Sequence, residues 1–315
     1  MLKQIVSNFN NISILVIGDI ILDRYYYGIN IGNASESPTP IIKINNIQEK
    51  PGGAANVAIN ISNLKGNVNI ISLSGYDYAT KYIRNKLVNS NIKCNLIKVK
   101  NYNTTIKSRI ISDNNQIIRL DLENKNNYFQ SPIMIKKIKS ILPHVNMLVL
   151  SDYNKGTLSS VQEIIRLARN LNIPIIVDPK GNNYDKYKGA NILTPNIYEF
   201  QKAIGTICYS NDDIVFYGLN VIKKYDLSAL LITRDKHGVS LIQPNNNPLH
   251  ILATQNKNIY NVVGAGDVII SILALLLSSN VNIKDSCILS NKAAGLLVSK
   301  NNYFNIELED FISLI

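Results

Sequence analysis

The stretch that decides the fold is MLVLSDYNKGTLSSVQEIIRLARNLNIPIIVDPK, residues 147–180. It begins with a short apolar run, MLVLSD, which is typical of a buried strand. Apolar residues then recur at helical spacing through SSVQEIIRLARNLN (159–172), and IPIIVDPK (173–180) predicts the next strand. A strand, a helix and a second strand in this order predict a parallel βαβ unit with a right-handed crossover.

The same alternation extends outward in both directions. We expect further strands at ISILVIG (12–18), NVNIISLSG (67–75), NILTPN (191–196) and ALLITRD (229–235), and helices at AANVAINISNL (54–64) and from Tyr198. This pattern predicts an α/β fold with a mostly parallel central sheet and helices on its faces. We see no linker or tandem repeat, and we expect residues 1–315 to form a single domain.

Two stretches depart from this alternation. Residues 25–47 are rich in aromatic residues and proline and lack a helical pattern, and residues 104–122 resemble two strands around a turn at Asp113–Asn115. Both lie between elements of the α/β body. We therefore expect them to form a small β-sheet lid over one face of the main domain.

A polar residue stands at the carboxyl end of several predicted strands. These residues are Asp19, Asp152, Asp178, Asn196 and Arg234. Any one of them could be an ordinary turn residue. Since ligands of open α/β sheets bind at that edge, five such positions favour a ligand site there.

Composition excludes several other classes. The formal charge is +11, from 33 Lys and Arg against 22 Asp and Glu, but the lysines are scattered, so we expect no nucleic-acid partner. The three cysteines and three histidines show no metal-ligand spacing. The run Val268–Leu277 is about half of the ~20 residues that span a bilayer, and the N-terminus lacks a signal-peptide core. We expect a cytoplasmic protein with no membrane partner.

The segment NVVGAGDVIISILALLLSS (261–279) places a carboxylate before a strongly apolar helix. The backbone N–H groups of Gly264, Ala265 and Gly266, together with the helix dipole, suit the charge on a transferring phosphoryl group. Asp267 could accept a proton from an attacking hydroxyl. The alternative is an acid that only stabilises the helix N-terminus, worth ~0.3–1 kcal/mol, and this alternative is favoured for the motif taken alone.

Two further segments carry polar residues suited to a sugar. In PGGAANVAIN (51–60), Gly52 and Gly53 permit close approach to the backbone, and Asn56 can donate and accept hydrogen bonds. In GDIILDRY (18–25), Asp19 and Asp23 could bind vicinal hydroxyls. The alternatives are a turn before a core helix and a pair of solvated acids.

Together these residues resemble the ribokinase-like (PfkB) family of carbohydrate kinases. The G-G-x-x-x-N-x-A pattern matches Gly52–Ala58, and G-A-G-D matches Gly264–Asp267. The resemblance runs nearly end to end. Within the family it is closer to the heptose 7-phosphate kinases, through the strings GDIILDRYYYG, EKPGGAANVAINISNL, NQIIRLDLE, LVLSDYNKGTL, VDPKG, LTPNIYEF, SALLITRDKHGVSLIQ and VGAGDVII.

The resemblance implies a fold and a reaction. The fold would be a ribokinase-like three-layer sandwich with a β-sheet lid that often pairs two subunits into a homodimer. The reaction would move the γ-phosphoryl group of ATP, with Mg²⁺, to the anomeric C1 hydroxyl of D-glycero-β-D-manno-heptose 7-phosphate. The 1,7-bisphosphate would serve ADP-heptose and lipopolysaccharide core synthesis. We expect no fused nucleotidyltransferase domain in this sequence.

The resemblance also implies roles for individual residues. Asp267 would be the base, and Gly264, Ala265 and Gly266 the anion hole. The sugar would be held by Asp19, Gly52, Gly53 and Asn56, to which we add Asp23. ATP would be met by Asn196, Glu199, Thr233, Arg234, Gly238 and Asn291, with Asn196 and Glu199 organising Mg²⁺ through water. Our candidates for the second phosphate are Lys107, Arg109, Arg119 and Lys180, each of which could instead be a solvated charge.

Three departures from the family pattern bear on these roles. Asn261 and Val263 replace an acid and a hydroxyl before G-A-G-D, which weakens the case for a monovalent-cation site. Gly32 stands where the family pattern has an Arg, and SKNNYFNI (299–306) replaces the family's last turn.

The alternatives are a PfkB kinase for another sugar or nucleoside, and a decayed protein that only binds its ligand. A nicotinamide-dependent dehydrogenase and a P-loop enzyme are disfavoured, because neither glycine motif is present.

Overall fold

The computed structural model describes residues 2–113, 115–124, 131–254, 262–300 and 305–315. In these ranges the α/β body is built on a nine-stranded sheet of order β13-β12-β11-β10-β9-β8-β1-β4-β5. Its strands are β1 (Ser13–Gly18), β4 (Asn67–Ser74), β5 (Lys93–Lys98), β8 (Met147–Ser151), β9 (Ile175–Asp178), β10 (Ile192–Leu193), β11 (Ala229–Thr233), β12 (Val239–Ile242) and β13 (Leu249–Ile251). Neighbours pair in parallel from β5 to β11, and β12 and β13 are antiparallel.

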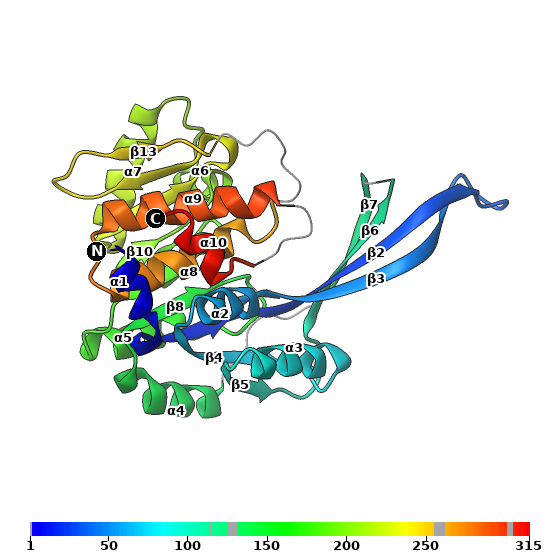
Figure 1. Cartoon of the computed structure of the whole chain (residues 1–315), viewed down its shortest axis with the longest axis horizontal. Helices are drawn as coiled ribbons and strands as arrows, with labels where there is room; N and C mark the ends of the chain where they lie inside the picture. The colour runs from blue at the N-terminus through cyan, green and yellow to red at the C-terminus, as the bar shows by residue number, and fades with distance from the viewer. Residues whose placement is uncertain (1, 114, 125–130, 255–261, 301–304) are drawn as a thin grey trace.

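Helices cover both faces of this sheet, which gives three layers (Figure 1). They are α1 (Leu2–Ser7), α2 (Ala54–Asn63), α3 (Tyr78–Asn89), α4 (Pro132–Ile141), α5 (Val161–Asn170), α6 (Ile197–Ile204), α7 (Asn211–Tyr225), α8 (Ala265–Ser278), α9 (Ile283–Ser299) and α10 (Leu308–Ile312), with 3-10 turns at Phe9–Asn11, Leu142–His144, Asp185–Tyr187 and Asp235–His237. The predicted fold class is confirmed.

Strict alternation along the strands separates two hydrophobic cores. In β1, Ile14 and Val16 enter the core formed with α2, α8 and α9, whereas Leu15 and Ile17 enter the core formed with α4, α5 and α7. Successive strand side chains point to opposite faces, so a strand covered on both sides must be apolar throughout. This is why the body strands could be recognised as short, uninterrupted apolar runs.

A second sheet of order β3-β2-β6-β7 projects from the body as an arm, which we call the lid (Figure 1). Its strands are β2 (Ile20–Asn33), β3 (Pro40–Gly53), β6 (Thr105–Ser112) and β7 (Asn115–Leu122). The β2–β3 and β6–β7 pairs are antiparallel, and β2 pairs with β6 in parallel. The strands cover most of the predicted stretches 25–47 and 104–122, and β2 and β3 reach further into the body, because their pairing continues to Ile20 opposite Gly53.

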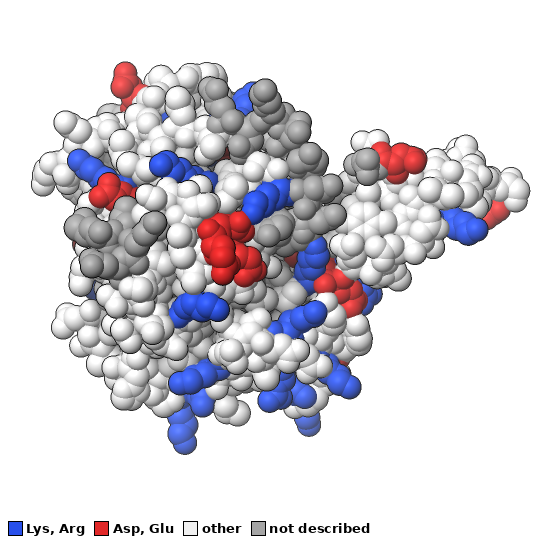
Figure 2. Space-filling model, viewed as in Figure 1, with Lys and Arg blue, Asp and Glu red and all other residues white. Residues whose placement is uncertain are grey.

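The two faces of the lid differ in chemistry. One cross-strand row is Lys50, Asp23, Lys107 and Asp121, and the row beyond it contains Tyr25, Arg109 and Arg119. The row between them, on the opposite face, contains Arg24, Ser108 and Leu120, and the next such row is Ile47, Tyr26, Ile110 and Ile118. In the view of Figure 2 the arm presents mainly uncharged surface. The lid therefore has a charged face and a largely apolar face.

None of the helices in the described ranges has both the length and the apolar character that crossing a bilayer requires. The apolar helix α8 is buried over most of its length, against α2 and α9. Burial in the body core accounts for its composition.

Candidate active site

A cleft of about 800 Å³ lies at the carboxyl edge of the central strands. Asp152, Asp178, Asn196 and Arg234, which follow β8, β9, β10 and β11, all line it. These strands are adjacent and parallel, so their carboxyl ends meet at one edge, as the sequence predicted. Asp19 follows β1 at the same edge but is not among the lining residues.

The cleft also collects most of the residues that the resemblance singled out for the nucleotide and for catalysis. Its lining includes Lys180, Asn196, Glu199, Thr233, Arg234, Gly238, Gly264, Ala265, Gly266, Asp267 and Asn291. Val262 lines it as well, and Asn261 lies outside the described residues.

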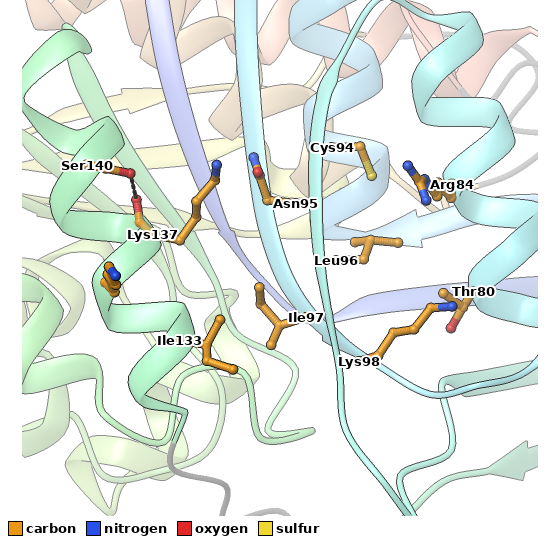
Figure 3. A pocket seen from close by; sticks show the side chains of 11 residues that line it. Thr80, Arg84, Cys94, Asn95, Leu96, Ile97, Lys98, Ile133, Lys137 and Ser140 are labelled. Atoms are coloured by element: carbon orange, nitrogen blue, oxygen red, sulfur yellow. Dashed lines mark hydrogen bonds between the residues drawn. The ribbon is translucent and has the colours of Figure 1, made fainter.

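A separate pocket of about 430 Å³ lies between α3, β5 and α4 (Figure 3). Its lining carries Arg84, Lys98, Lys136 and Lys137, and no carboxylate among the residues described there. None of the residues predicted from the sequence to form a site lines this pocket. The cleft at the strand ends is therefore the candidate active site.

Asp267 lies in the first turn of α8, at the mouth of the cleft. Gly264 precedes the helix with φ 89°, a left-handed conformation that glycine adopts without strain. Among the described residues no side chain caps this helix, and the Ala265 N–H donates to the Val262 carbonyl at 3.4 Å. Such a terminus can bind an anion.

Two donors from distant elements hold the Asp267 carboxylate. Asn56 Nδ2 in α2 donates to Oδ2 at 2.6 Å, and the Tyr153 hydroxyl donates to Oδ1 at 3.2 Å. Asp267 is only 6% exposed. Burial raises the pKa of Asp267 to about 6, although the hydrogen bonds from Asn56 and Tyr153 favour the ionised form. A carboxylate of this kind is ionised at neutral pH and can still take up a proton.

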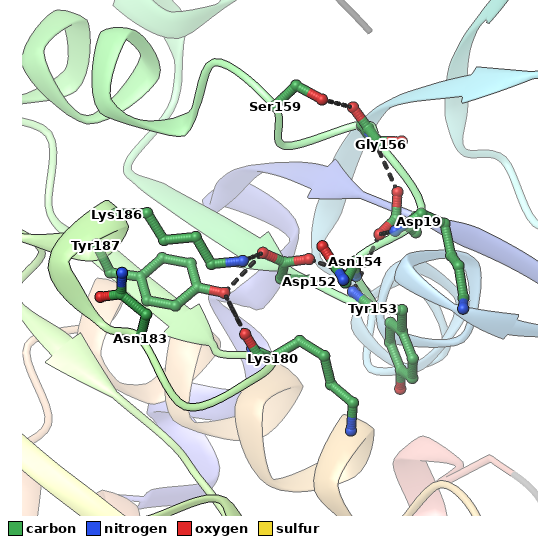
Figure 4. Close-up of polar contacts among 12 residues, drawn as sticks. Asp19, Asp152, Tyr153, Asn154, Gly156, Ser159, Lys180, Asn183, Lys186 and Tyr187 are labelled. Atoms are coloured by element: carbon green, nitrogen blue, oxygen red, sulfur yellow. Dashed lines mark hydrogen bonds and ion pairs between the residues drawn. The ribbon is translucent and has the colours of Figure 1, made fainter. Parts of the chain in front are cut away.

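Tyr153 owes its position to Asp19 (Figure 4). The Asp19 carboxylate accepts three backbone N–H bonds, from Tyr153 at 3.0 Å, Lys155 at 2.9 Å and Thr157 at 2.9 Å. Asp19 is 1% exposed. Its side chain is therefore directed into the loop after β8 and fixes the course of that loop past the cleft.

Asp152 organises the other side of the same loop (Figure 4). Its Oδ2 accepts from the Tyr187 hydroxyl at 2.6 Å and from Lys186 Nζ at 2.8 Å. The Tyr187 hydroxyl in turn accepts from the backbone N–H of Lys180 at 2.9 Å. These bonds link the loop after β8 to the loop after β9.

Asp23, Gly52 and Gly53 lie where the lid joins the body. Asp23 Oδ1 accepts from Arg109 at 2.6 Å. A Cβ atom at Gly52 would lie 2.1 Å from Asp23 Oδ2, so a side chain here would displace the Asp23 carboxylate. Gly53 is the N-cap residue of α2, three residues before Asn56. The carboxylate of Asp23 and the amide of Asn56 thus lie on either side of one short junction.

The lid cations lie on the charged face. Lys107 Nζ stands 5.2 Å from the centre of the Tyr153 ring, which brings this face of the lid to the site. Burial lowers the pKa of Lys107, opposed by the charges of Asp23 and Asp121. Arg109 lies 5.2 Å over the Tyr25 ring, and Arg119 is half exposed and paired with Asp121 at 2.9 Å.

Lys180 lies apart from these lid cations. Its Nζ is 2.6 Å from Glu199 Oε1, at the start of α6. Asn196 and Glu199 form a capping box, in which Asn196 Oδ1 accepts from the Glu199 N–H at 2.9 Å. The predicted sugar-phosphate ligand Lys180 is therefore grouped with the predicted nucleotide ligands.

Two more predicted nucleotide residues are held by neighbours. Arg234 donates to Asn211 and to Ser240, each at 2.7 Å. Asn291 in α9 donates to the carbonyl of Leu252 at 2.8 Å.

Sequence reasoning missed four residues of the site. Tyr153 and Lys50 stood beside recognised motifs, in LVLSDYNKG and EKPGG, but nothing in those strings indicated their partners. Asp178 was noted only as a strand-end residue. Asn305, whose Nδ2 donates to Asn56 Oδ1 at 2.8 Å, carried no signal at all.

Asp178 is partly buried beside two other acids. Burial, followed by the charges of Asp267 and Glu199, raises the pKa of Asp178 well above its usual range. Three carboxylates near one another repel, and a cation would relieve that repulsion. No cluster of three or more His, Cys, Asp or Glu suited to a metal occurs in the described portion of the chain.

The fold and the site together define a sugar kinase of the ribokinase type. The model of the pfkB family of carbohydrate kinases matches residues 11–307, and the chain belongs to that family. It is a carbohydrate kinase, and the expected resemblance is confirmed.

Known proteins agree with this assignment. The chain is 42% identical, over 95% of its length, to "Bifunctional protein HldE" of Vibrio vulnificus (strain YJ016), and spans 62% of that protein. It therefore covers less than two thirds of this relative. Ribokinase of Arabidopsis thaliana, solved with ribose and ATP, superposes with a TM-score of 0.79 at 15% identity over 96% of this chain and 98% of that one. Phosphofructokinase-2 of Escherichia coli superposes with a TM-score of 0.80 at 16% identity, over 96% and 98%. These last two likenesses concern the fold.

Proposed function

We propose that the protein transfers the γ-phosphoryl group of ATP to the C1 hydroxyl of D-glycero-β-D-manno-heptose 7-phosphate. The product would be the 1,7-bisphosphate, which would feed ADP-heptose and lipopolysaccharide core synthesis. The proposal combines the resemblance to heptose 7-phosphate kinases with the 42% identity to the HldE protein of Vibrio vulnificus.

The observation that carries the proposal is the position of Asp267. It lines the cleft, it is bonded to Asn56 beside the lid junction, and its pKa responds to Asp23 and Lys107 of the lid. A sugar held by the lid junction and ATP held in the cleft would meet at this carboxylate. Among the described residues, no other acid that lines the cleft is also recorded as interacting with both Asn56 and the charged residues of the lid.

In this proposal Asp267 accepts the proton of the attacking C1 hydroxyl. The backbone N–H groups at the start of α8 would stabilise the charge on the transferring group, because they are fixed donors at the positive end of a helix dipole. The chain would otherwise act by positioning, since phosphoryl transfer needs little covalent help from protein. Closure of the lid would exclude water from the reacting groups.

The lid junction would hold the sugar. Asp23 and Asn56 would bind its hydroxyls, and Gly52 and Gly53 would let it approach the backbone. Asp19 would support the Tyr153 loop, since its carboxylate already accepts three backbone N–H bonds.

The charged face of the lid would recognise the second phosphate. Lys107, Arg109 and Arg119 lie there on adjacent strands. Lys50 belongs to the same row as Lys107, and burial lowers the pKa of Lys50 to about 8. A phosphate dianion would favour the protonated lysines, which burial otherwise disfavours. Because it pairs with Glu199, Lys180 would serve the ATP phosphates instead.

ATP would lie along the cleft from Asn291 to Gly264. Thr233, Arg234 and Gly238 would flank its phosphates. A magnesium ion fits the charges here, because Asp178 and Glu199 repel each other when ionised and a cation would relieve that repulsion. Asn196 and Glu199 are engaged in the capping box, so they would act through water. Bound Mg²⁺ would neutralise charge on the phosphates.

The lid would also pair two subunits. Ile47, Ile118, Leu120 and Leu122 are 47–55% exposed on its apolar face. An exposed sheet face of this kind is typical of a protein interface. A second copy of the chain, offering the same face, would cover it in a homodimer.

The test is an assay of ATP with heptose 7-phosphate, and with unphosphorylated heptose, read by ³¹P and ¹³C NMR. We expect a 1,7-bisphosphate and a strong preference for the phosphorylated sugar. Phosphate gained at another carbon, or no preference, would refute the substrate assignment.

A second candidate is a kinase for another phosphorylated sugar. The charged lid face favours a phosphate-bearing acceptor but does not select the carbon chain. A panel of hexose, pentose and heptose phosphates under the same conditions would separate the two candidates by kcat/KM.

A further inference from the structure

The base has a second layer of support that comes from the C-terminal segment. Asn305 Nδ2 donates to Asn56 Oδ1 at 2.8 Å, and Asn56 Nδ2 donates to Asp267 Oδ2 at 2.6 Å. Asn305 lies 249 residues from Asn56 in sequence. Three side chains from α2, from α8 and from the segment after α9 thus form one hydrogen-bonded chain.

The direction of this chain matters because an amide has two different ends. The carboxamide of Asn56 has nearly the same shape after a half turn about its last side-chain bond, so its partners decide which end faces Asp267. An ionised carboxylate only accepts hydrogen bonds. Asn305 offers a donor to Oδ1, and this leaves Nδ2 for Asp267.

The segment that carries Asn305 is itself anchored to α2. The backbone N–H of Ile306 donates to Asn60 Oδ1 at 2.9 Å, and Asn60 Nδ2 donates to the carbonyl of Asn56 at 3.0 Å. Ile306 is 1% exposed, and Asn60 is fully buried. Asn305 therefore meets Asn56 through a fixed backbone.

We propose that Asn305 is a positioning residue, which fixes the amide of Asn56 with its donor toward Asp267 and so holds the base ready for proton transfer. This inference rests on the proposed role of Asp267. It assigns a positioning role to the segment after α9, which no sequence motif indicated.

The expected effects follow from the charges around the base. Asp267 is faced by Tyr153 from the loop after β8, by Asp178 at the end of β9, and by Asp23 and Lys107 from the lid. The bond from Asn56 lowers the pKa of Asp267. Without Asn305 only Asp267 orients the amide, so the bond from Asn56 is held less firmly and the pKa of Asp267 rises. We expect the acid limb of kcat to move up by about one pH unit, with a roughly fivefold loss at pH 6 that approaches tenfold at lower pH.

The experiment compares three variants by pH profiles of kcat and by KM for ATP. Asn305→Ala removes the donor, and Asn305→Asp keeps the shape while offering an acceptor. Asn63→Ala is the matched control, because Asn63 in α2 bonds the same segment at Glu307, at 2.8 Å, without reaching Asp267. We expect the acid limb to move in both Asn305 variants and not in Asn63→Ala, with KM for ATP unchanged in all three.

A double-mutant cycle with Asn56→Ala completes the test. If Asn305 acts through Asn56, adding Asn305→Ala to Asn56→Ala changes kcat no further. Additive losses, or an Asn305→Ala profile that matches Asn63→Ala, would overturn the inference. Near-normal turnover of Asp267→Asn would overturn the proposed base and this inference together. An inactive Asp267→Asn beside an unmoved Asn305→Ala profile would overturn this inference alone.

Discussion

The polar residues in the cleft of the body and those on the charged face of the lid have different kinds of neighbours. In the body, Asp19, Asn196 and Arg234 are engaged with other protein groups through hydrogen bonds. On the lid, a row alternates Lys50, Asp23, Lys107 and Asp121 across four strands at the edge of the site. Under the proposed function this difference would be a division of labour, in which the body fixes the geometry of transfer and the lid selects the acceptor by charge.

The largest effect should come from removing the proposed base, because Asp267 lies where the cleft of the body and the lid meet. Asp267→Asn keeps the shape and the contact region of the carboxylate but cannot accept the proton. We expect kcat to fall by roughly 10²–10⁴-fold, while ATP still binds when measured by calorimetry. A variant with turnover near that of the parent would remove Asp267 from the chemistry.

Removing one lysine from the lid and one from the cleft should affect the KM values of different substrates. Lys107→Ala should raise KM for the sugar phosphate by roughly ten- to a hundredfold, the cost of one charge-assisted hydrogen bond, and leave KM for ATP unchanged. Lys180→Ala should do the reverse, since Lys180 pairs with Glu199 in the cleft. Steady-state kinetics with each substrate varied in turn decides this. If both variants raised KM for the same substrate, the lid and the cleft would not bind different substrates.

The pH dependence of kcat/KM should reflect the ionisation of the buried Asp267. Because the pKa of Asp267 is raised to about 6, its reactive ionised form is lost as the pH falls through that value. We expect kcat/KM to decline about tenfold per pH unit below pH 6 and to be level above it up to the next titration. A rate that stays level down to pH 4 would mean that no group with this pKa is needed.

The smallest kinetic effect should come from the apolar face of the lid. Ile118→Lys with Leu120→Lys should convert a dimer into a monomer in light scattering, because the charges would be buried at the proposed interface. Phe216→Lys in α7 is the control, since Phe216 is 61% exposed on the body. Monomers in the parent protein would refute the homodimer, and dimers in both variants would place the interface elsewhere.

The body could be predicted from the sequence more fully than the lid. Strands such as β1 are buried on both faces, so composition alone marks them. The 14-residue lid strands β2 and β3 extend beyond the predicted stretch 25–47, and exposed residues such as Ile31 and Ile44 give no periodicity that would mark where the strands end. Which residues share a lid row depends on strand register, and the sequence does not state it.

The site shows the same limit at the level of single residues. Asp267, Gly52 and Asn56 belong to short motifs whose local geometry is fixed by glycine and by the helix start. Nothing in the strings that contain Tyr153 and Asn305 indicated their partners, because these lie more than 100 residues away in sequence. Long-range hydrogen bonds of that kind become visible only in the folded chain.

The most direct test of the account is a crystal structure with heptose 7-phosphate and a non-hydrolysable ATP analogue. The account predicts that the C1 hydroxyl lies about 2.6–3.2 Å from Asp267, with the sugar phosphate against Lys107 and Arg109 and the nucleotide in the cleft. A sugar phosphate seated at Lys180, or a C1 hydroxyl directed away from Asp267, would contradict it.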